Sequence, residues 1–363
     1  MAYISVKKAN CKNCYKCLKY CDVKSIRYID DRVEVIEDQC ILCGHCINIC
    51  PQQAKTVVND PTAVLEMLSD PAVRVVASLA PSYIGVYGQD AREKVTAALY
   101  RMGFAAVEET AIGAHEVSAA YKKLMDDGEM PVILTTCCPT VNSLITKYYP
   151  DLIPMMAPVV SPVLAHGRMI KQRDGKDTRV VFIGPCLAKK SEAREPDIAD
   201  AVDYVLTFQE VRDLFDFADI HPEMMAEDNR EHSSTGGRIY ARAGGVSQAV
   251  QDCVQRLNPG RKIKVHAVQA SGVPACKQLL NDLKEGKLDA NFLEGMGCAG
   301  GCVGGPRALI GKELARDNVN RYGEEAPTPT PVDNPYVIEL LHRLGFPTVE
   351  SLLENDTLFT RTF

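Results

Sequence analysis

Beyond about residue 60, the chain alternates short apolar runs with longer segments in which apolar and polar residues mix. The apolar runs are rich in Val and Ile and end in small residues, which is typical of strands buried in a parallel sheet. The segments 90–103 and 273–286 carry apolar residues at the spacing of an amphipathic helix. This alternation predicts an α/β fold. The predicted strands lie in VRVVASLAPS (73–82), PVILTTCC (131–138), TRVVFIGPC (178–186), KIKVHAVQASG (262–272) and DANFLEGMGC (289–298).

Three of these runs end at cysteines. Cys137 and Cys138 close the second run, Cys186 closes the third, and Cys298 closes the fifth, with Cys302 four residues later. In open parallel sheets, sites form beyond the carboxyl ends of the strands. The sequence therefore predicts that cysteines far apart in the chain converge in one cleft.

The first 50 residues follow a different pattern, in which C-x2-C-x2-C-x3-C occurs twice. Such a run places three thiolates around one iron-sulfur cubane, and its fourth cysteine ligates the neighbouring cluster. Two zinc sites are the alternative, but the doubled eight-cysteine spacing argues against them. The region resembles a bacterial two-cluster ferredoxin, an α+β domain that passes single electrons. One 4Fe-4S cluster is assigned to Cys11, Cys14, Cys17 and Cys50, and the other to Cys40, Cys43, Cys46 and Cys21.

Composition narrows the function classes. A chain of 363 residues, 46% of them hydrophobic, can bury a sizeable core and divide into domains. The formal charge of −6 and the lack of a continuous basic run argue against nucleic acid as a partner. No signal-peptide core and no apolar stretch of membrane-spanning length is seen, so we expect no membrane association and a cytoplasmic protein. In a reducing compartment, fifteen cysteines indicate metal ligands rather than disulfides.

Three segments in the second part of the chain carry a family resemblance. TTCCPT, PCLAKKSE and EGMGCAGGC resemble, in order, the signature segments of FeFe (iron-iron) hydrogenases. The resemblance spans nearly the whole chain and implies an H-cluster. This cofactor is a 4Fe-4S cubane bridged by a cysteine to a diiron centre that carries carbon monoxide, cyanide and a dithiolate amine. By position, the cubane ligands are Cys138, Cys186, Cys298 and Cys302, with Cys302 as the bridging thiolate.

The same resemblance assigns roles around the diiron centre. Cys137 matches a free thiol that hands protons to the amine, and its alternative is a small buried hydrophobe. Lys189 matches a donor to a cyanide, and its alternative is a surface charge. Met296 matches a residue packed on the diiron ligands, and its alternative is a residue that fills the core. Glu192 occupies a familiar acidic position. The loop Ala80, Pro81 and Ser82 matches a donor to the second cyanide, and Gly244 and Gly245 match a pair that admits backbone close to the cofactor, or else form a turn.

Departures from the family pattern concern the proton route. Val141 stands where active members usually carry tryptophan, and Gly184 where methionine is usual. Productive members relay protons from the thiol through a glutamate, a serine and a second glutamate. An ungapped match places Tyr121, Ala157 and Leu124 at those positions, so the route is predicted to be cut, with Glu116 as a candidate substitute.

The sequence thus predicts an α+β ferredoxin-like domain (1–60), an α/β two-lobed hydrogenase domain (61–306) and a C-terminal linker with a clasping helix (307–363). We expect reversible heterolytic activation of dihydrogen, with slow turnover or a sensing role. Electrons would pass through the two 4Fe-4S clusters to a ferredoxin-like or other redox protein, and maturation proteins would supply the diiron unit. The alternative is a non-catalytic hydrogenase-like iron-sulfur protein, acting as an electron carrier or assembly factor.

Overall fold

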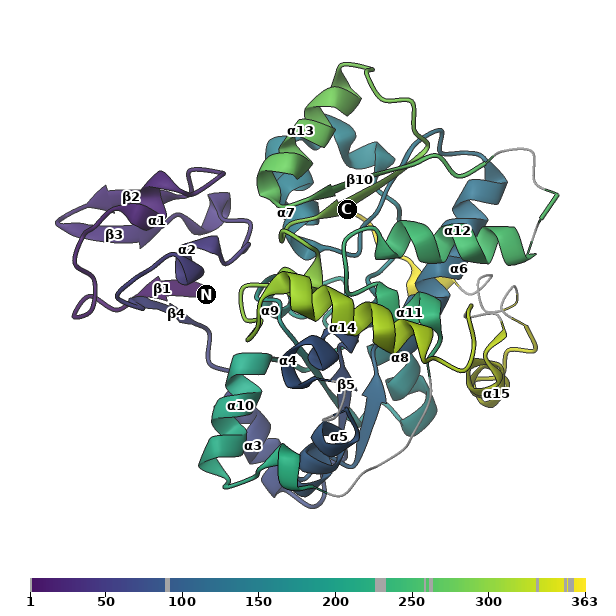
Figure 1. Cartoon of the computed structure of the whole chain (residues 1–363), viewed down its shortest axis with the longest axis horizontal. Coiled ribbons are helices and arrows are strands. Elements are labelled where there is room, and N and C mark those ends of the chain that lie inside the picture. Colours follow the sequence, from purple (N-terminus) through teal and green to yellow (C-terminus); the bar gives the residue numbers. More distant parts are fainter. Residues whose placement is uncertain are drawn as a thin grey trace.

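A computed structural model describes residues 2–88, 92–225, 233–257, 259–260, 264–330, 333–348, 351 and 356–363 (Figure 1). Parts of three predicted segments lie outside the described residues: 90–91 of the first helix, 262–263 of the fourth strand, and 331–332 of the C-terminal linker. Among the described residues, no helix is both long and apolar enough to cross a lipid bilayer.

The N-terminal unit consists of two small antiparallel sheets and two short helices. Strand β1 pairs with β4, and β2 pairs with β3 as a hairpin. In Figure 1 this unit, in purple, stands at one side of the larger body. Its elements are β1 (Ile4–Val6), α1 (Lys16–Lys19), β2 (Ile26–Ile29), β3 (Arg32–Val35), α2 (His45–Asn48) and β4 (Lys55–Val57).

A four-stranded parallel sheet in the order β6-β5-β8-β9 forms the first lobe of the larger body. Every residue of β5 is buried, as expected for a parallel strand covered on both faces. Helices α5, α8 and α10 pack against this sheet. The elements are α3 (Pro61–Ser69), β5 (Val75–Leu79), α5 (Arg92–Arg101), β6 (Ala106–Glu109), α8 (Pro162–Asp174), β8 (Arg179–Gly184), β9 (Tyr204–Thr207) and α10 (Phe208–Phe217).

A three-stranded parallel sheet in the order β10-β11-β7 forms the second lobe. Helices α7, α12 and α13 pack on it, and a separate hydrophobic core joins α7 and α13. The elements are β7 (Ile133–Leu134), α7 (Pro139–Tyr148), α12 (Gly245–Leu257), β10 (Ala267–Ser271), α13 (Val273–Lys284) and β11 (Phe292–Met296).

Two helices hold the lobes together. Helix α6 (Ala111–Asp127) is buried on nearly all sides along its first eleven residues and packs on α8, α11 and α12. Helix α14 (Lys312–Glu324) crosses the middle of the molecule, where it contacts α4 and α11 (Figure 1). The remaining helices are α4 (Ile84–Tyr87), α9 (Ala188–Glu192), α11 (Thr235–Ile239), α15 (Pro335–Arg343) and α17 (Asp356–Phe359).

The N-terminal unit is anchored to the larger body by polar contacts. Asp60 is buried and forms ion pairs with Lys190, which is also fully buried, and with Arg194. Lys147 Nζ donates to the carbonyl oxygen of Cys40 at 2.8 Å. Because Lys190 belongs to α9, these contacts place the cysteine-rich unit beside the helix that follows Cys186.

The predicted fold class is confirmed, since each of the five predicted runs contains a strand and the two lobes are α/β. Two strands of the first sheet, β6 and β9, were not predicted. Strand β6 has the sequence AVEE, and its two glutamates are buried because Glu108 pairs with Arg173 and Glu109 with Arg238. Because two of its four residues are glutamates, this buried strand could not be recognised as an apolar run. The boundaries of the three predicted domains stay a prediction.

Candidate metal centre

The two cysteine runs of the N-terminal unit fold as a repeated backbone. Cys11 corresponds to Cys40, so equivalent residues lie 29 positions apart. Left-handed conformations recur at that spacing: Asn13 (φ 50°) with Leu42 (φ 55°), Tyr15 (φ 58°) with Gly44 (φ 73°), and Lys24 (φ 55°) with Gln53 (φ 47°). Non-glycine residues seldom adopt this conformation, so its recurrence shows that both halves impose the same chain path.

Backbone amides in this unit point at cysteine sulfurs. Ser25 N donates to Cys21 Sγ at 3.3 Å, and its equivalent Ala54 N donates to Cys50 Sγ at 3.3 Å. Burial raises the pKa of both Cys43 and Cys46 to about 12. Thiols that are mostly half-buried, free of disulfides and in part hydrogen-bonded by backbone amides fit iron-sulfur clusters, because cluster iron takes up thiolates and hydrogen bonds to their sulfurs stabilise them.

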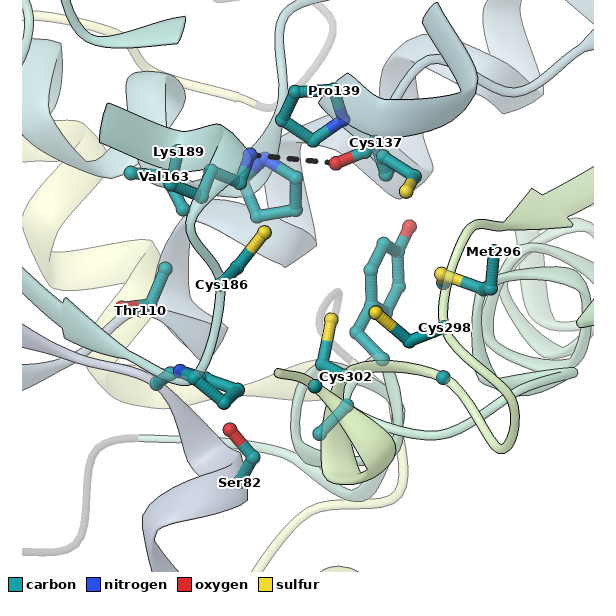
Figure 2. A pocket seen from close by; sticks show the side chains of 18 of the residues that line it. Ser82, Thr110, Cys137, Pro139, Val163, Cys186, Lys189, Met296, Cys298 and Cys302 are labelled. Carbon is teal, nitrogen blue, oxygen red and sulfur yellow. Dashed lines mark hydrogen bonds between the residues drawn. The ribbon is translucent and has the colours of Figure 1, made fainter. Parts of the chain in front are cut away.

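A cavity of about 90 Å³ lies where the two lobes meet. Its wall is formed by the carboxyl ends of β5, β8 and β11 and by the segment after β7, as expected for parallel sheets. In Figure 2 the sulfurs of Cys137, Cys186, Cys298, Cys302 and Met296 point toward its middle. The surface is mainly apolar, with Pro139, Pro162, Val163, Phe182 and Ala241 among its residues.

Four cysteines from separate elements line this cavity. Cys138 precedes α7, Cys186 follows β8 and a proline, Cys298 follows β11, and Cys302 opens a short 3-10 turn. Burial raises the pKa of Cys186 to about 11 and also raises those of Cys298 and Cys302, with the other cysteines adding to the effect. Several buried thiolates without a cation would repel each other, so this donor set fits an iron-sulfur cubane.

Glycines allow the backbone to approach this site closely. A Cβ on Gly297 would lie 2.5 Å from Thr140 Cγ2, and one on Gly301 would lie 2.4 Å from the backbone nitrogen of Ala243. Gly301 also has a φ of 89°, a conformation that favours glycine. The segment between Cys298 and Cys302 therefore requires glycine for its path around the cavity.

Cys137 lies beside Cys138 but has a different environment. Its sulfur is 3.6 Å from the hydroxyl of Tyr121, and burial raises the pKa of its thiol to about 12. The Tyr121 hydroxyl also accepts from Thr136 N at 2.8 Å. The structure therefore keeps Cys137 as a neutral S–H group at the cavity wall, held by one phenol.

Lys189 is buried and lines the cavity, so it is not a surface charge. Its ammonium donates to Glu192 Oε2 at 2.5 Å and to the carbonyl oxygen of Cys137 at 3.4 Å (Figure 2). Ser161 Oγ donates to the same carboxylate oxygen at 3.0 Å. Glu192 is not among the lining residues; within the described part of the chain, it contacts the site through Lys189 and holds the ammonium in place.

The other predicted residues divide into two groups. Ala80, Pro81, Ser82 and Met296 all line the cavity, and the buried Ser82 hydroxyl has no hydrogen-bond partner among the described residues. Gly244 and Gly245 are not among the lining residues, so their expected approach to a cofactor is not seen. A Cβ on Gly245, the first residue of α12, would lie 1.8 Å from the Ile239 carbonyl oxygen, so the close packing of these two backbones requires glycine there.

Glu294 was not predicted as a site residue, and it holds the turn that contains Gly244. Its buried carboxylate accepts from Gly244 N at 2.6 Å and from Ser247 N at 2.7 Å, at the start of α12. Burial raises the pKa of Glu294, whereas these amide donors lower it. An acidic residue inside an otherwise apolar strand run, FLEGM, was the available signal.

The positions of the predicted proton route hold no carboxylate. Ala157 is fully buried, and Leu124 lies at the edge of the core. Thr136 Oγ1, which neighbours Tyr121, donates to the carbonyl oxygen of Val159 at 2.8 Å. Glu116 is buried on α6 with neither oxygen hydrogen-bonded in the described residues, and burial raises its pKa to about 8. No described hydrogen bond connects Glu116 to Cys137.

One ferredoxin-type cysteine group lies near the cavity. A Cβ on Gly44 would lie 2.4 Å from Pro306 Cβ and 3.0 Å from Leu187, so these segments pack tightly. The group with Cys21, Cys40, Cys43 and Cys46 is thus the inner one.

Comparisons with known proteins match both parts of the chain. Residues 73–306 match the family described as iron only hydrogenase large subunit, C-terminal domain, and residues 33–56 match the 4Fe-4S binding domain. The chain is 28% identical to the periplasmic Fe hydrogenase large subunit of Nitratidesulfovibrio vulgaris, over 87% of this chain and 89% of that protein. It is 22% identical to cytosolic iron-sulfur assembly component 3 of Bos taurus, over 86% and 80%.

Solved structures show the same fold. A structure of the FeFe-hydrogenase HydA1 from Chlamydomonas reinhardtii matches 84% of this chain and 99% of its own, with a TM-score of 0.67 and 21% identity. A structure described as a step in H-cluster assembly, HydA(deltaEFG), matches the same shares with a TM-score of 0.66 and 20% identity.

Proposed function

The chain belongs to the family of the iron-only hydrogenase large subunit, and we propose that it is an FeFe hydrogenase that converts dihydrogen reversibly to protons and electrons with slow turnover. One observation carries the proposal. Besides the four cysteines assigned to a cubane, the cavity is lined by the thiol of Cys137, the ammonium of Lys189 and the hydroxyl of Ser82, which has no hydrogen-bond partner among the described residues. A cubane alone needs none of these three groups.

In this proposal, Cys138, Cys186, Cys298 and Cys302 would hold the cubane of an H-cluster, with Cys302 as the ligand that it would share with the diiron centre. The bound group would supply the low-valent iron on which dihydrogen is activated. Lys189 and Ser82 would donate hydrogen bonds to its anionic ligands, and a charge-assisted bond is strong in a dry pocket. Met296 and the prolines exclude water, which strengthens these interactions.

Cys137 holds the proton that this site exchanges. Its S–H is a weak donor that can pass a proton only to a group within hydrogen-bond distance. The neighbouring phenol of Tyr121 has a pKa raised well above its usual value by burial. The adjacent Thr136 hydroxyl donates to a carbonyl oxygen, which does not accept a proton at neutral pH. Slow proton delivery, and hence slow turnover or a sensing role, follows from this arrangement.

Electrons would leave through the two N-terminal clusters to a redox protein partner, and maturation proteins would insert the diiron unit. We infer a cytoplasmic location, where reduced cysteines and iron-sulfur clusters are stable. A second candidate is a non-catalytic iron-sulfur protein, favoured by the similarity to the assembly component and by the missing route carboxylates. The cavity groups beyond the four cysteines argue against it.

Isotope exchange tests the proposal without a redox partner. Matured protein under deuterium gas in ordinary water should release HD slowly, because splitting of the gas and exchange with solvent need no redox partner but depend on the same slow proton delivery through Cys137. Cys137→Ala should lower the rate. Absence of HD from fully matured protein would favour the non-catalytic candidate.

A further inference from the structure

The helix that carries Lys189 is too short to hold its own position. Helix α9 has five residues, and an isolated helix of that length is not stable in water, because its nucleation costs more free energy than so few hydrogen bonds return. The placement of α9 therefore depends on contacts with the rest of the fold. This placement matters for the cavity, since Lys189 lines it and Glu192, one turn later, fixes the ammonium.

One set of contacts comes from a segment more than 150 residues away in sequence. The segment 358–363 lies antiparallel to the segment 158–160. Val160 N donates to the carbonyl oxygen of Phe359 at 2.8 Å, and the Phe359 ring is buried in the main hydrophobic core. The residue that follows is Ser161, which donates to the same carboxylate oxygen as the ammonium of α9 does. The distant segment thus supports the second donor to that carboxylate.

Arg361 ties the same segment to the turn that follows α9. Its side chain is 5% exposed, and its guanidinium pairs with Glu195 at 2.6 Å and with Asp197 at 3.6 Å. The backbone nitrogen of Glu195 donates to the carbonyl oxygen of Glu192 at 3.1 Å, so Glu195 continues the turn of the helix. A guanidinium bound to a carboxylate is a charge-assisted link of defined geometry. One buried arginine therefore connects the 358–363 segment to the end of α9.

We propose that Arg361 is a positioning residue for Lys189 and acts on it through Glu195 and Glu192. Arg361 is not among the described residues that line the cavity, so it touches no bound group itself. It fixes the direction in which the Lys189 ammonium is presented to anionic ligands in the cavity. A buried ion pair often stabilises a fold no better than apolar packing does, so geometry rather than stability accounts for a cation at this position. This inference rests on the proposed function, which supplies the anionic ligands.

Hydrogen–deuterium exchange of the protein loaded with cubanes alone tests whether Arg361 holds α9. Arg361→Met removes the guanidinium but keeps an unbranched side chain, and peptides within 187–196 should then exchange about tenfold faster or more than in wild type. Arg361→Lys keeps a cation that can reach Glu195 and should recover part of the protection. Arg173→Met is the matched control, because Arg173 is also a largely buried arginine but pairs with Glu108 of β6. It should leave the exchange of 187–196 unchanged.

Infrared spectroscopy of the same variants after maturation tests whether this placement serves the site. In Arg361→Met the ammonium loses its fixed direction, so a cyanide band should shift and retention of the diiron unit should fall about twofold or more, with cubane iron unchanged. Arg361→Lys should lie between this variant and wild type, and Arg173→Met should match wild type. A general loss of stability would not shift the cyanide frequency of the molecules that stay folded, so the band position separates positioning from stability.

A second variant keeps the test decisive if Arg361→Met does not fold. Glu195→Gln removes the same ion pair at its more exposed partner and should show both changes to a smaller extent. Unchanged exchange in 187–196, or faster exchange with cyanide bands like those of wild type, would overturn the proposal. Because the exchange measurement needs neither dihydrogen nor the diiron unit, it decides whether Arg361 holds α9 even if matured wild type shows no cyanide bands and the hydrogenase proposal fails.

Discussion

Replacing Lys189 with alanine should separate two roles of this residue, in stability and in cofactor retention. Lys189 and Glu192 form a buried ion pair in which the carboxylate keeps one further donor, Ser161, while its other oxygen is unpartnered in the described residues. Lys189→Ala leaves the Glu192 carboxylate without its cation in a buried position.

The structure sets the expected size of this effect. Removing one partner of a buried ion pair costs about 3–5 kcal/mol, because an uncompensated charge remains. For a chain of 363 residues that corresponds to a fall of about 4–7 °C in melting temperature. Lys189→Met with Glu192→Gln removes both charges and should recover most of that loss.

Cofactor retention should respond differently. The double variant still lacks a cationic donor to cyanide, so both variants should retain less of the diiron unit than wild type after maturation, while their cubanes stay in place. Differential scanning fluorimetry gives the melting temperature, and infrared absorbance of iron-bound cyanide gives the retention. If the double variant regains wild-type cyanide bands, Lys189 is a structural partner of Glu192 and its assigned role is wrong.

Further predictions concern iron content, the proton route and pH. Protein reconstituted without the diiron unit should hold about twelve irons, and Cys186→Ala should hold about eight; a wild-type count near eight would exclude the third cubane. Tyr121→Phe should lower stability by about 1–3 kcal/mol, because the amide of Thr136 loses its acceptor, yet change dihydrogen evolution little; a tenfold fall in rate would make the phenol a relay. Tyr121→Glu, Leu124→Glu and Ala157→Ser together should raise turnover about tenfold or more, whereas no gain would indicate another route. Glu116 has a pKa raised from 4.5 to about 8, so unfolding releases its proton and stability falls as pH rises from about 4.5 to 8. Glu116→Gln should therefore raise the melting temperature at pH 8 more than at pH 5, and an equal effect at both would contradict the burial of an uncharged carboxyl.

Much of the site could be predicted because the cysteines and the ends of the predicted strands can both be recognised in short stretches of sequence. Cys138, Cys186 and Cys298 each follow an apolar run, and parallel sheets bring such ends together, so convergence followed from sequence order alone. The repeat of the N-terminal unit was equally visible, since cluster ligation fixes cysteine spacing.

What could not be predicted depends on partners far apart in sequence. Glu108 and Glu109 can be buried in β6 because Arg173 and Arg238 pair with them in the folded protein. These arginines are distant in sequence, so the strand was not predicted. The hydrogen bond from Gly244 to Glu294 could not be predicted either, because the two residues are 50 positions apart in the chain.

Infrared spectroscopy of the matured wild-type protein tests the central claim most directly. Carbon monoxide and cyanide on iron absorb where protein does not, so the spectrum reports the diiron unit alone. If the cavity bounded by Cys137, Lys189 and the four cysteines holds an H-cluster, the spectrum should show both kinds of band, and they should vanish in Cys302→Ala. A matured protein with its full complement of cubanes and no such bands would contradict the hydrogenase proposal and leave a non-catalytic iron-sulfur protein.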